Sequence, residues 1–254
     1  MELPRTPSFR LDGKRALVAG ATSGIGLAAA VACAEAGAET VLAARRADVL
    51  ADLVAALTER GLKASSMVLD VGDVEATAAQ VLAAGPFQIL VNSAGTARHS
   101  KTVDTTLSDF DAVMNLNVRG AYFLTQTVAK GLLAAGLPGS LINISSQMAV
   151  VGGMERAVYC ASKHAVEGFT KAMAIEFGPD KIRVNTICPT FVRTPLTEPT
   201  FARPELVEWI TSKIKLGRIG EVTDLMGPVV YLASDASALV TGTSHLVDGG
   251  WTAD

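Results

Sequence analysis

Residues 16–26, with the sequence ALVAGATSGIG, decide the fold of this chain. Four apolar residues predict a buried strand, and the glycines after them lead directly into an Ala-rich helical pattern that runs to Glu35. Such a turn lets the backbone approach a pyrophosphate, while the helix N-terminus offers free N–H groups and a partial positive charge. The stretch predicts a dinucleotide-phosphate site made by Gly20, Thr22, Ser23, Gly24, Ile25 and Gly26. An ordinary glycine-rich turn between a strand and a helix is the alternative.

Short apolar runs alternate with longer helical patterns along the rest of the chain. About seven strands are predicted, at Ala16–Ala19, Thr40–Ala43, Ala64–Leu69, Ile89–Val91, Leu141–Ile144, Arg183–Ile187 and Ser244–Val247. Strands this apolar are buried on both faces, and right-handed crossovers place helices on either side, so a parallel, doubly wound sheet is expected. We expect one α/β domain over residues 1–254, with 1–12 as an N-terminal tail.

The charge balance argues against polyanionic partners. The 254 residues hold 22 Lys plus Arg against 25 Asp plus Glu, a formal net charge of -3, which gives no general attraction for nucleic acid or anionic lipid. Residues 1–12 contain no apolar run that would make a signal peptide or membrane anchor, so a cytoplasmic protein is expected. The scattered cysteines and histidines predict neither a disulfide framework nor a metal site.

The end of the second predicted strand bears on the choice of cofactor. Dinucleotide sites distinguish a ribose hydroxyl from a 2′-phosphate there, and an acid at this point favours NAD. Ala44 removes that carboxylate, and Arg45 and Arg46 supply donors for a phosphate. NADP is therefore the preferred cofactor. NAD stays open, because both arginines can equally belong to a solvated helix start.

Small and polar residues follow the third and fourth predicted strands at the same edge of the sheet. Asp70, which precedes Val71, can accept a hydrogen bond from an adenine amino group. Asn92 can brace the sheet edge, while Ala94 and Gly95 leave room for a ribose. Simple turn residues at strand ends would give the same pattern.

Tyr159 and Lys163 lie four positions apart in a helical pattern from Ala157 to Phe177, which places both side chains on one helix face. A phenol with a pKa of about 10 is a poor base at neutral pH unless a nearby cation stabilises the phenolate. Lys163, together with a positively charged nicotinamide, can do that. Tyr159 is therefore the predicted proton-exchanging group, and both residues are also expected to contact the cofactor.

Ser146 and Asn117 complete the predicted catalytic set. Ser146 ends the fifth strand and can hold the substrate oxygen. Asn117, in the helix before that strand, can anchor a water that links Lys163 to solvent.

The substrate is expected between Ser146, Tyr159 and a lid at about residues 195–215, where prolines interrupt any regular pattern through Trp209. Gln147 and Arg156 are further predicted substrate-binding residues, and Arg156 can reach a carboxylate or polyol oxygen.

Other charged side chains lie nearby in the sequence. Glu155, Arg193 and Arg203 can add polar contacts to the substrate. Surface salt bridging is an equally good interpretation of each charge taken alone.

The chain resembles the short-chain dehydrogenase/reductase family over nearly its whole length. The resemblance is carried by Gly20-x-x-x-Gly24-Ile25-Gly26, Asn92-Ser93-Ala94-Gly95, Asn117, Ser146, Tyr159-x-x-x-Lys163, the stretch from Pro189 to Thr194, and Asp248-Gly249-Gly250. Within the family, Ile144-Ser145-Ser146-Gln147, Val158-Tyr159-Cys160 and Cys188-Pro189-Thr190 are most similar to the NADPH-preferring dicarbonyl/L-xylulose reductases.

The resemblance implies a Rossmann-type subunit, often a homotetramer, with an Asn117, Ser146, Tyr159, Lys163 tetrad. It adds Pro189, Thr190, Val192 and Thr194 as cofactor-binding residues. The chain departs from the usual family pattern at Ala19, Ser93 and Thr190, and Ser23 stands where many NADP enzymes carry Lys or Arg.

The expected activity is NADPH-dependent reduction of a sugar-like ketone or dicarbonyl to a secondary alcohol. An NAD-dependent dehydrogenase of a polyol or sugar-derived hydroxy acid is the alternative. A dinucleotide-binding interaction subunit without turnover is a third interpretation, against which the intact tetrad argues.

Overall fold

The computed structural model describes residues 3–253 and contains a seven-stranded parallel sheet in the order β3-β2-β1-β4-β5-β6-β7. The strands are β1 Arg15–Ala19, β2 Glu39–Ala44, β3 Ala64–Val68, β4 Ile89–Asn92, β5 Gly139–Ile144, β6 Ile182–Pro189 and β7 Ser244–Val247. The predicted fold class is confirmed. Met1, Glu2 and Asp254, which the expected domain includes, lie outside the described residues.

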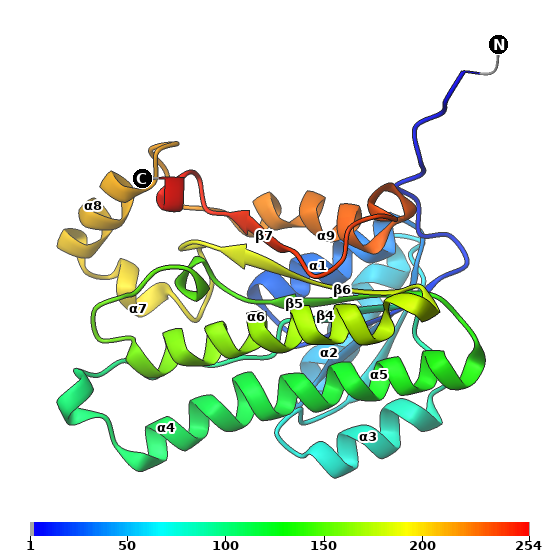
Figure 1. The fold of residues 1–254 in the computed structure, drawn as a ribbon, viewed down its shortest axis with the longest axis horizontal. Coiled ribbons are helices and arrows are strands. Elements are labelled where there is room, and N and C mark those ends of the chain that lie inside the picture. Colours follow the sequence, from blue (N-terminus) through cyan, green and yellow to red (C-terminus); the bar gives the residue numbers. More distant parts are fainter. Residues whose placement is uncertain (1–2, 254) are drawn as a thin grey trace.

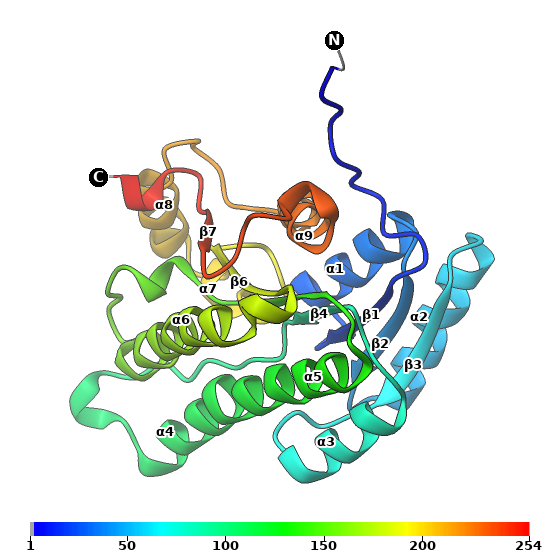
Figure 2. The ribbon, with the colours of Figure 1, turned by 45° about the vertical axis from the view of Figure 1, so that its right-hand side comes forward.

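Helices cover both faces of the sheet, as Figure 1 and Figure 2 show. One face carries α1 Gly24–Glu35, α2 Ala47–Glu59 and α9 Met226–Ala233, and the other carries α3 Val74–Ala83, α5 Ala121–Ala135 and α6 Ala157–Phe177. Side chains of a strand alternate between the two faces. Accordingly, Ala16 and Val18 of β1 pack into the first layer, and Leu17 and Ala19 pack into the second. All four are fully buried, which explains the unbroken apolar run.

Shorter elements connect these layers. Helix α4 Leu107–Met114 continues into α5 through a π-helical segment, η2 Asn115–Gly120. Short 3-10 turns are η1 Thr102–Asp104, η3 Gln147–Ala149, η4 Gly178–Asp180, η5 Val222–Leu225, η6 Asp235–Ser237 and η7 Trp251–Ala253.

The strand order reverses between β1 and β4, which are hydrogen-bonded neighbours although two strands and three helices separate them along the chain. From β1 the chain winds toward β2 and β3, and from β4 it winds toward β5, β6 and β7. The diverging connections leave a crevice beyond the carboxyl ends of β1 and β4, where sheets of this kind bind ligands.

Two helices, α7 Glu198–Phe201 and α8 Pro204–Lys213, lie beyond the carboxyl ends of β6 and β7 (Figure 1). The expectation that prolines interrupt regular structure through Trp209 is wrong. Pro199 and Pro204 occupy the first turns of these helices, where a missing N–H costs no helical hydrogen bond. Trp209 of α8 packs against Trp251, with ring centroids 5.4 Å apart, so the C-terminal turn contacts this segment.

The predicted N-terminal tail is anchored at its last residues. Residues 3–10 form no helix or strand, whereas Leu11 is fully buried. The Leu11 N–H donates to the Ala36 carbonyl at 2.8 Å, and the Phe9 ring lies 6.3 Å from the ring of Tyr231 on α9.

Candidate active site

The turn between β1 and α1 has no space for side chains at two of its glycines. Gly20 has a φ of +77°, and a Cβ there would lie 2.9 Å from the backbone nitrogen of Ala94. A Cβ on Gly26 would overlap the carbonyl oxygen of Gly20. The Ser23 side chain makes no capping hydrogen bond to α1, which leaves the first N–H groups of this helix available to a ligand.

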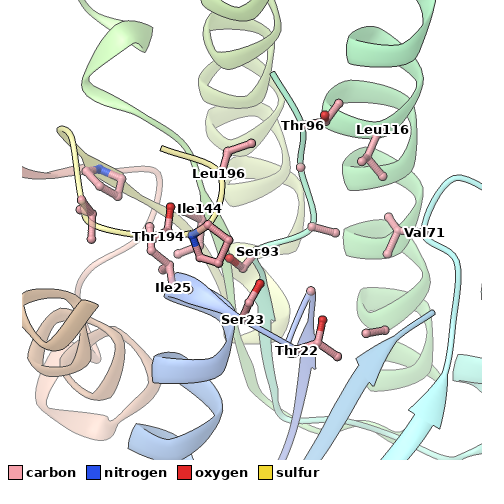
Figure 3. A pocket seen from close by; sticks show the side chains of 18 of the residues that line it. Thr22, Ser23, Ile25, Val71, Ser93, Thr96, Leu116, Ile144, Thr194 and Leu196 are labelled. Carbon is pink, nitrogen blue, oxygen red and sulfur yellow. The ribbon is translucent and has the colours of Figure 1, made fainter. Parts of the chain in front are cut away.

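A cleft of about 450 Å³ opens beside this turn. In Figure 3, Thr22, Ser23 and Ile25 approach it from the β1–α1 turn, Thr194 and Leu196 from the segment after β6, and Thr96 and Leu116 from the opposite side. The predicted site residues among its lining are Gly20, Thr22, Ser23, Gly24, Ile25, Arg45, Arg46, Asp70, Val71, Ala94, Gly95, Ser146, Tyr159, Lys163, Pro189, Thr190, Val192 and Thr194. Five predicted site residues do not line the cleft, namely Gly26, Asn92, Asn117, Gln147 and Arg156.

The cleft reaches the end of β2, where the cofactor choice was predicted. Ala44 is the last residue of β2, and both following arginines are exposed. Arg46 donates to the Thr22 hydroxyl at 3.0 Å, so its guanidinium lies over the glycine turn. No ion pair holds Arg45 among the described residues, and its donors remain available to a phosphate.

Asn92 lies behind the cleft wall and joins neighbouring strands. Its Nδ2 donates to Asn143 Oδ1 of β5 at 3.2 Å, and its Oδ1 accepts the Ala94 N–H at 3.3 Å. This contact joins the end of β4 to β5, and the cofactor-binding role of Asn92 stays a prediction. Asp70 accepts the Gly72 N–H at 2.9 Å through Oδ1, which orders the turn after β3.

The polar groups of the cleft fit a dinucleotide. Thr190 Oγ1 is a buried atom with no hydrogen-bond partner in the described part of the chain, and it borders the cleft. A buried hydroxyl in this state gains a hydrogen bond when a ligand amide or hydroxyl reaches it. Together with the crowded glycine turn and the free arginine, it supports the predicted cofactor site.

Tyr159 and Lys163 occupy the first two turns of α6 at the far end of the cleft. Lys163 is buried, and its Nζ donates to the Ile144 carbonyl at 2.9 Å and lies 5.6 Å from the centroid of the Tyr159 ring. One ammonium hydrogen is thus fixed at the end of β5, and the charge is held beside the phenol.

Burial dominates the proton affinities of this pair. Burial raises the pKa of the Tyr159 phenol, which the Ser146 hydroxyl and the charge of Arg156 lower only in part. Burial also lowers the pKa of Lys163 to about 8, opposed by Cys188 and Glu167. Lys163 is not among the groups that shift the phenol pKa, and the raised pKa favours the protonated, proton-donating phenol at neutral pH. The expected stabilisation of the phenolate by Lys163 together with a nicotinamide stays a prediction.

Ser146 and Gln147 follow β5 as predicted and lie next to Tyr159. The Ser146 hydroxyl donates to Gln147 Oε1 at 3.2 Å and accepts the Met148 N–H at 3.1 Å. Gln147 is almost completely buried, and its Nε2 lacks a partner among residues 3–253. Gln147 does not line the cleft, so its contact with a substrate stays a prediction.

Asn117 lies in the π-helical segment and not in a regular α-helix as expected. Its Oδ1 accepts the Thr96 N–H at 2.8 Å, and its Nδ2 donates to the Thr96 carbonyl at 2.8 Å and to Ser162 Oγ at 3.2 Å. These bonds tie the loop after β4 to α6. The predicted water relay stays a prediction, because these contacts involve the protein alone.

Sequence reasoning missed two residues near this site. The ring of His99 meets the Tyr159 ring edge-on, with centroids 6.4 Å apart. Glu167 is buried one turn after Lys163 and accepts hydrogen bonds from Thr186 and Cys188 of β6, at 3.0 and 3.3 Å, and from Ser244 of β7. The i, i+4 spacing from Lys163 was the available signal for Glu167, whereas nothing local marks His99.

The other charged candidates separate into paired and unpaired groups. Arg193 pairs with Glu221 at 3.2 Å and Arg203 with Glu205 at 2.9 Å, all with exposed side chains, so surface salt bridging accounts for them. Arg156 instead places its guanidinium 5.2 Å above the Phe191 ring.

Fold and cleft together define an oxidoreductase of the nicotinamide-dinucleotide class. The family described as Enoyl-(Acyl carrier protein) reductase matches residues 20–252. The chain belongs to the short-chain dehydrogenase/reductase family, and it is an NAD(P)-dependent enzyme acting on CH–OH groups.

Its relatives include reductases of small ketoses. D-erythrulose reductase of Gallus gallus is 40% identical over 245 residues, which cover 96% of this chain and 98% of that protein. L-xylulose reductase of Bos taurus is 38% identical over 246 residues, which cover 96% and 99%. A crystal structure of gluconate 5-dehydrogenase from Burkholderia cenocepacia J2315 with NADP and tartrate matches with a TM-score of 0.93 and 35% identity, covering 97% of this chain and 98% of that chain. The predicted resemblance to the carbonyl-reductase branch is confirmed.

Within residues 3–253, no group of histidine, cysteine and acidic side chains is arranged to hold a metal ion. None of the helices in this described part combines the length and apolar character needed to cross a membrane.

Proposed function

We propose that this enzyme reduces a sugar-like ketone to a secondary alcohol with NADPH. The observation that carries the proposal is the placement of Ser146, Tyr159 and Lys163 at one end of a cleft whose other end holds the glycine turn and Arg45. Its similarity to ketose reductases supports the substrate class. A panel of ketoses and dicarbonyls, assayed by loss of NADPH absorbance, tests it. Absence of turnover across the panel would contradict it.

Each tetrad residue has a separate role in this proposal. The bound nicotinamide supplies the hydride. Ser146 holds the substrate oxygen by its hydroxyl, and Tyr159 donates the proton to that oxygen as it becomes an alcohol. Lys163 keeps a positive charge beside the phenol, which stabilises the phenolate left after the proton has moved. Asn117 fixes the loop after β4 against α6 through Thr96 and Ser162.

The raised pKa of Tyr159 favours the reductive direction at neutral pH, because reduction starts from the protonated phenol. The NAD-dependent dehydrogenase of a polyol or hydroxy acid remains the alternative, since the chemistry is reversible. A higher kcat/KM for alcohol oxidation with NAD at neutral pH would favour it.

Cofactor preference depends on Arg45 in this account. We expect Arg45→Ala to raise the Kd for NADPH about tenfold and to leave the Kd for NADH unchanged, because only NADPH carries the phosphate that the guanidinium binds. Fluorescence titration measures both constants. Arg60→Ala is the matched control, because Arg60 is an exposed arginine paired with Glu35 outside the cleft. Equal weakening of both cofactors by Arg45→Ala would contradict the assignment.

The segment at about residues 195–215 is proposed as a lid over the substrate. It is supported by the position of α7 and α8 beyond the sheet and by Pro195 and Leu196 in the cleft wall.

We also propose a homotetramer, supported by the exposed aromatic side chains Phe110, Tyr122 and Phe123 on α4 and α5. Three free cysteines among the described residues support a reducing, cytoplasmic environment.

A further inference from the structure

Two loops meet beside Tyr159, one after β4 and one before α6. The Ser100 N–H donates to the Glu155 carbonyl at 3.1 Å, which joins them directly. Glu155 has a φ of +59°, a left-handed conformation that is unfavourable for a residue with a side chain. Strain of this kind persists only where the surroundings impose it, and it is concentrated at functional sites. The backbone conformation of Glu155 sets the position of the next residue, Arg156.

The joined loops bring two basic side chains to the same phenol. His99 lies against the Tyr159 ring, and the charge of Arg156 acts on both His99 and Tyr159. Burial lowers the pKa of both basic groups, and Arg156 lowers the pKa of His99 further, while Glu155 raises both. At neutral pH Arg156 keeps its positive charge although it is partly out of water, which is unfavourable without an anion nearby, while the lowered pKa of His99 leaves its ring neutral with one N–H donor.

No acidic side chain in the described part of the molecule forms an ion pair with Arg156, although the charge of Glu155 acts on Arg156 and His99. Glu155 is exposed and forms no ion pair with either group, and neighbouring Arg98 is already paired with Asp109 at 3.8 Å. Arg156 makes only a long hydrogen bond to the Met154 carbonyl, at 3.4 Å, besides its contact with the Phe191 ring. Most of its five N–H donors are available.

We propose that His99 and Arg156 form an anion subsite beside Tyr159, and that the enzyme acts on a sugar-like keto acid, or the hydroxy acid made from it, in preference to a neutral ketose. The inference rests on the proposed function. A planar guanidinium binds a carboxylate through two parallel hydrogen bonds, and the His99 ring adds an N–H donor. The carboxylate would be held here while the ketone of the same molecule faces Ser146 and Tyr159.

A matched pair of substrates tests this preference. 5-Keto-D-gluconate and L-sorbose present the same ketone on the same chain and differ in carrying a carboxylate or a hydroxymethyl group at the remote end. They are assayed with NADPH beside further ketoses and keto acids. We expect the best keto acid to exceed the best neutral ketose in kcat/KM by about tenfold or more. Equal or higher kcat/KM for the neutral ketoses would overturn the anion subsite.

Variants of Arg156 test whether this residue causes the preference for keto acids. Arg156→Ala should lower kcat/KM for the keto acid about tenfold, mainly by raising KM. The same variant should change kcat/KM for a neutral ketose by less than about threefold. Arg156→Gln, which has a shorter side chain with two N–H donors and no charge, should show the same selective loss. Arg98→Ala removes a neighbouring paired charge and should affect neither substrate. Equal losses on both substrates in the Arg156 variants would also overturn the proposal. NADPH binding without reduction of any compound would instead show that the proposed function has failed.

Discussion

Tyr159→Phe is expected to lower kcat for ketone reduction about 10³-fold, with less than about a threefold change in the Kd for NADPH. The variant keeps the ring that packs against His99 and removes only the hydroxyl that gives the proton. Without a donor at that position, the alkoxide formed as hydride arrives must take its proton from water. Steady-state kinetics and fluorescence titration on the same preparation separate the two effects.

Tyr122→Phe is the matched control for this variant, because Tyr122 is a surface residue on α5 outside the cleft. It should leave kcat unchanged. A Tyr159→Phe enzyme with more than a tenth of wild-type kcat would remove Tyr159 from the chemistry.

Lys163→Met is expected to lower kcat about 10²-fold and to change the pH profile. Because the pKa of Lys163 is lowered to about 8, its ammonium is present below that pH and lost as the pH rises through it. Wild-type kcat/KM for ketone reduction should therefore be level below about pH 8 and fall above it. The variant has no ammonium to lose and should lack this decrease.

Lys171→Met, an exposed position on the same helix, controls for a general effect of removing charge. Its profile should coincide with that of the wild type. A wild-type profile that stays level from pH 6 to pH 10 would contradict the role given to the Lys163 charge.

Local patterns were sufficient to predict the sheet and the glycine turn that borders the cleft. The apolar run of β1 and the glycines at Gly20 and Gly26 follow from contacts within one strand–turn–helix unit, so their spacing carries the information. The Tyr159 and Lys163 pair is likewise adjacent on one helix. The resemblance to a known family then assigned motifs that lie far apart in the chain, such as Asn117 and Ser146, to the same site.

Features that depend on distant contacts could not be predicted. His99 lies beside Tyr159 where the loops at Ser100 and Glu155 are joined, a contact between residues 55 positions apart in the chain. The raised pKa of Tyr159 comes from burial by several elements, and helical spacing alone suggested the opposite shift. Prolines that would break a helix interior instead begin α7 and α8, because position within the element decides their effect.

Isotope transfer tests the central claim most directly. The enzyme is given NADPH that carries deuterium at the transferable position of its nicotinamide ring, together with the best ketone of the panel, and the product is examined by NMR. The account predicts deuterium bonded to the new carbinol carbon and a hydroxyl hydrogen derived from water. A reduced product without deuterium at that carbon would contradict it.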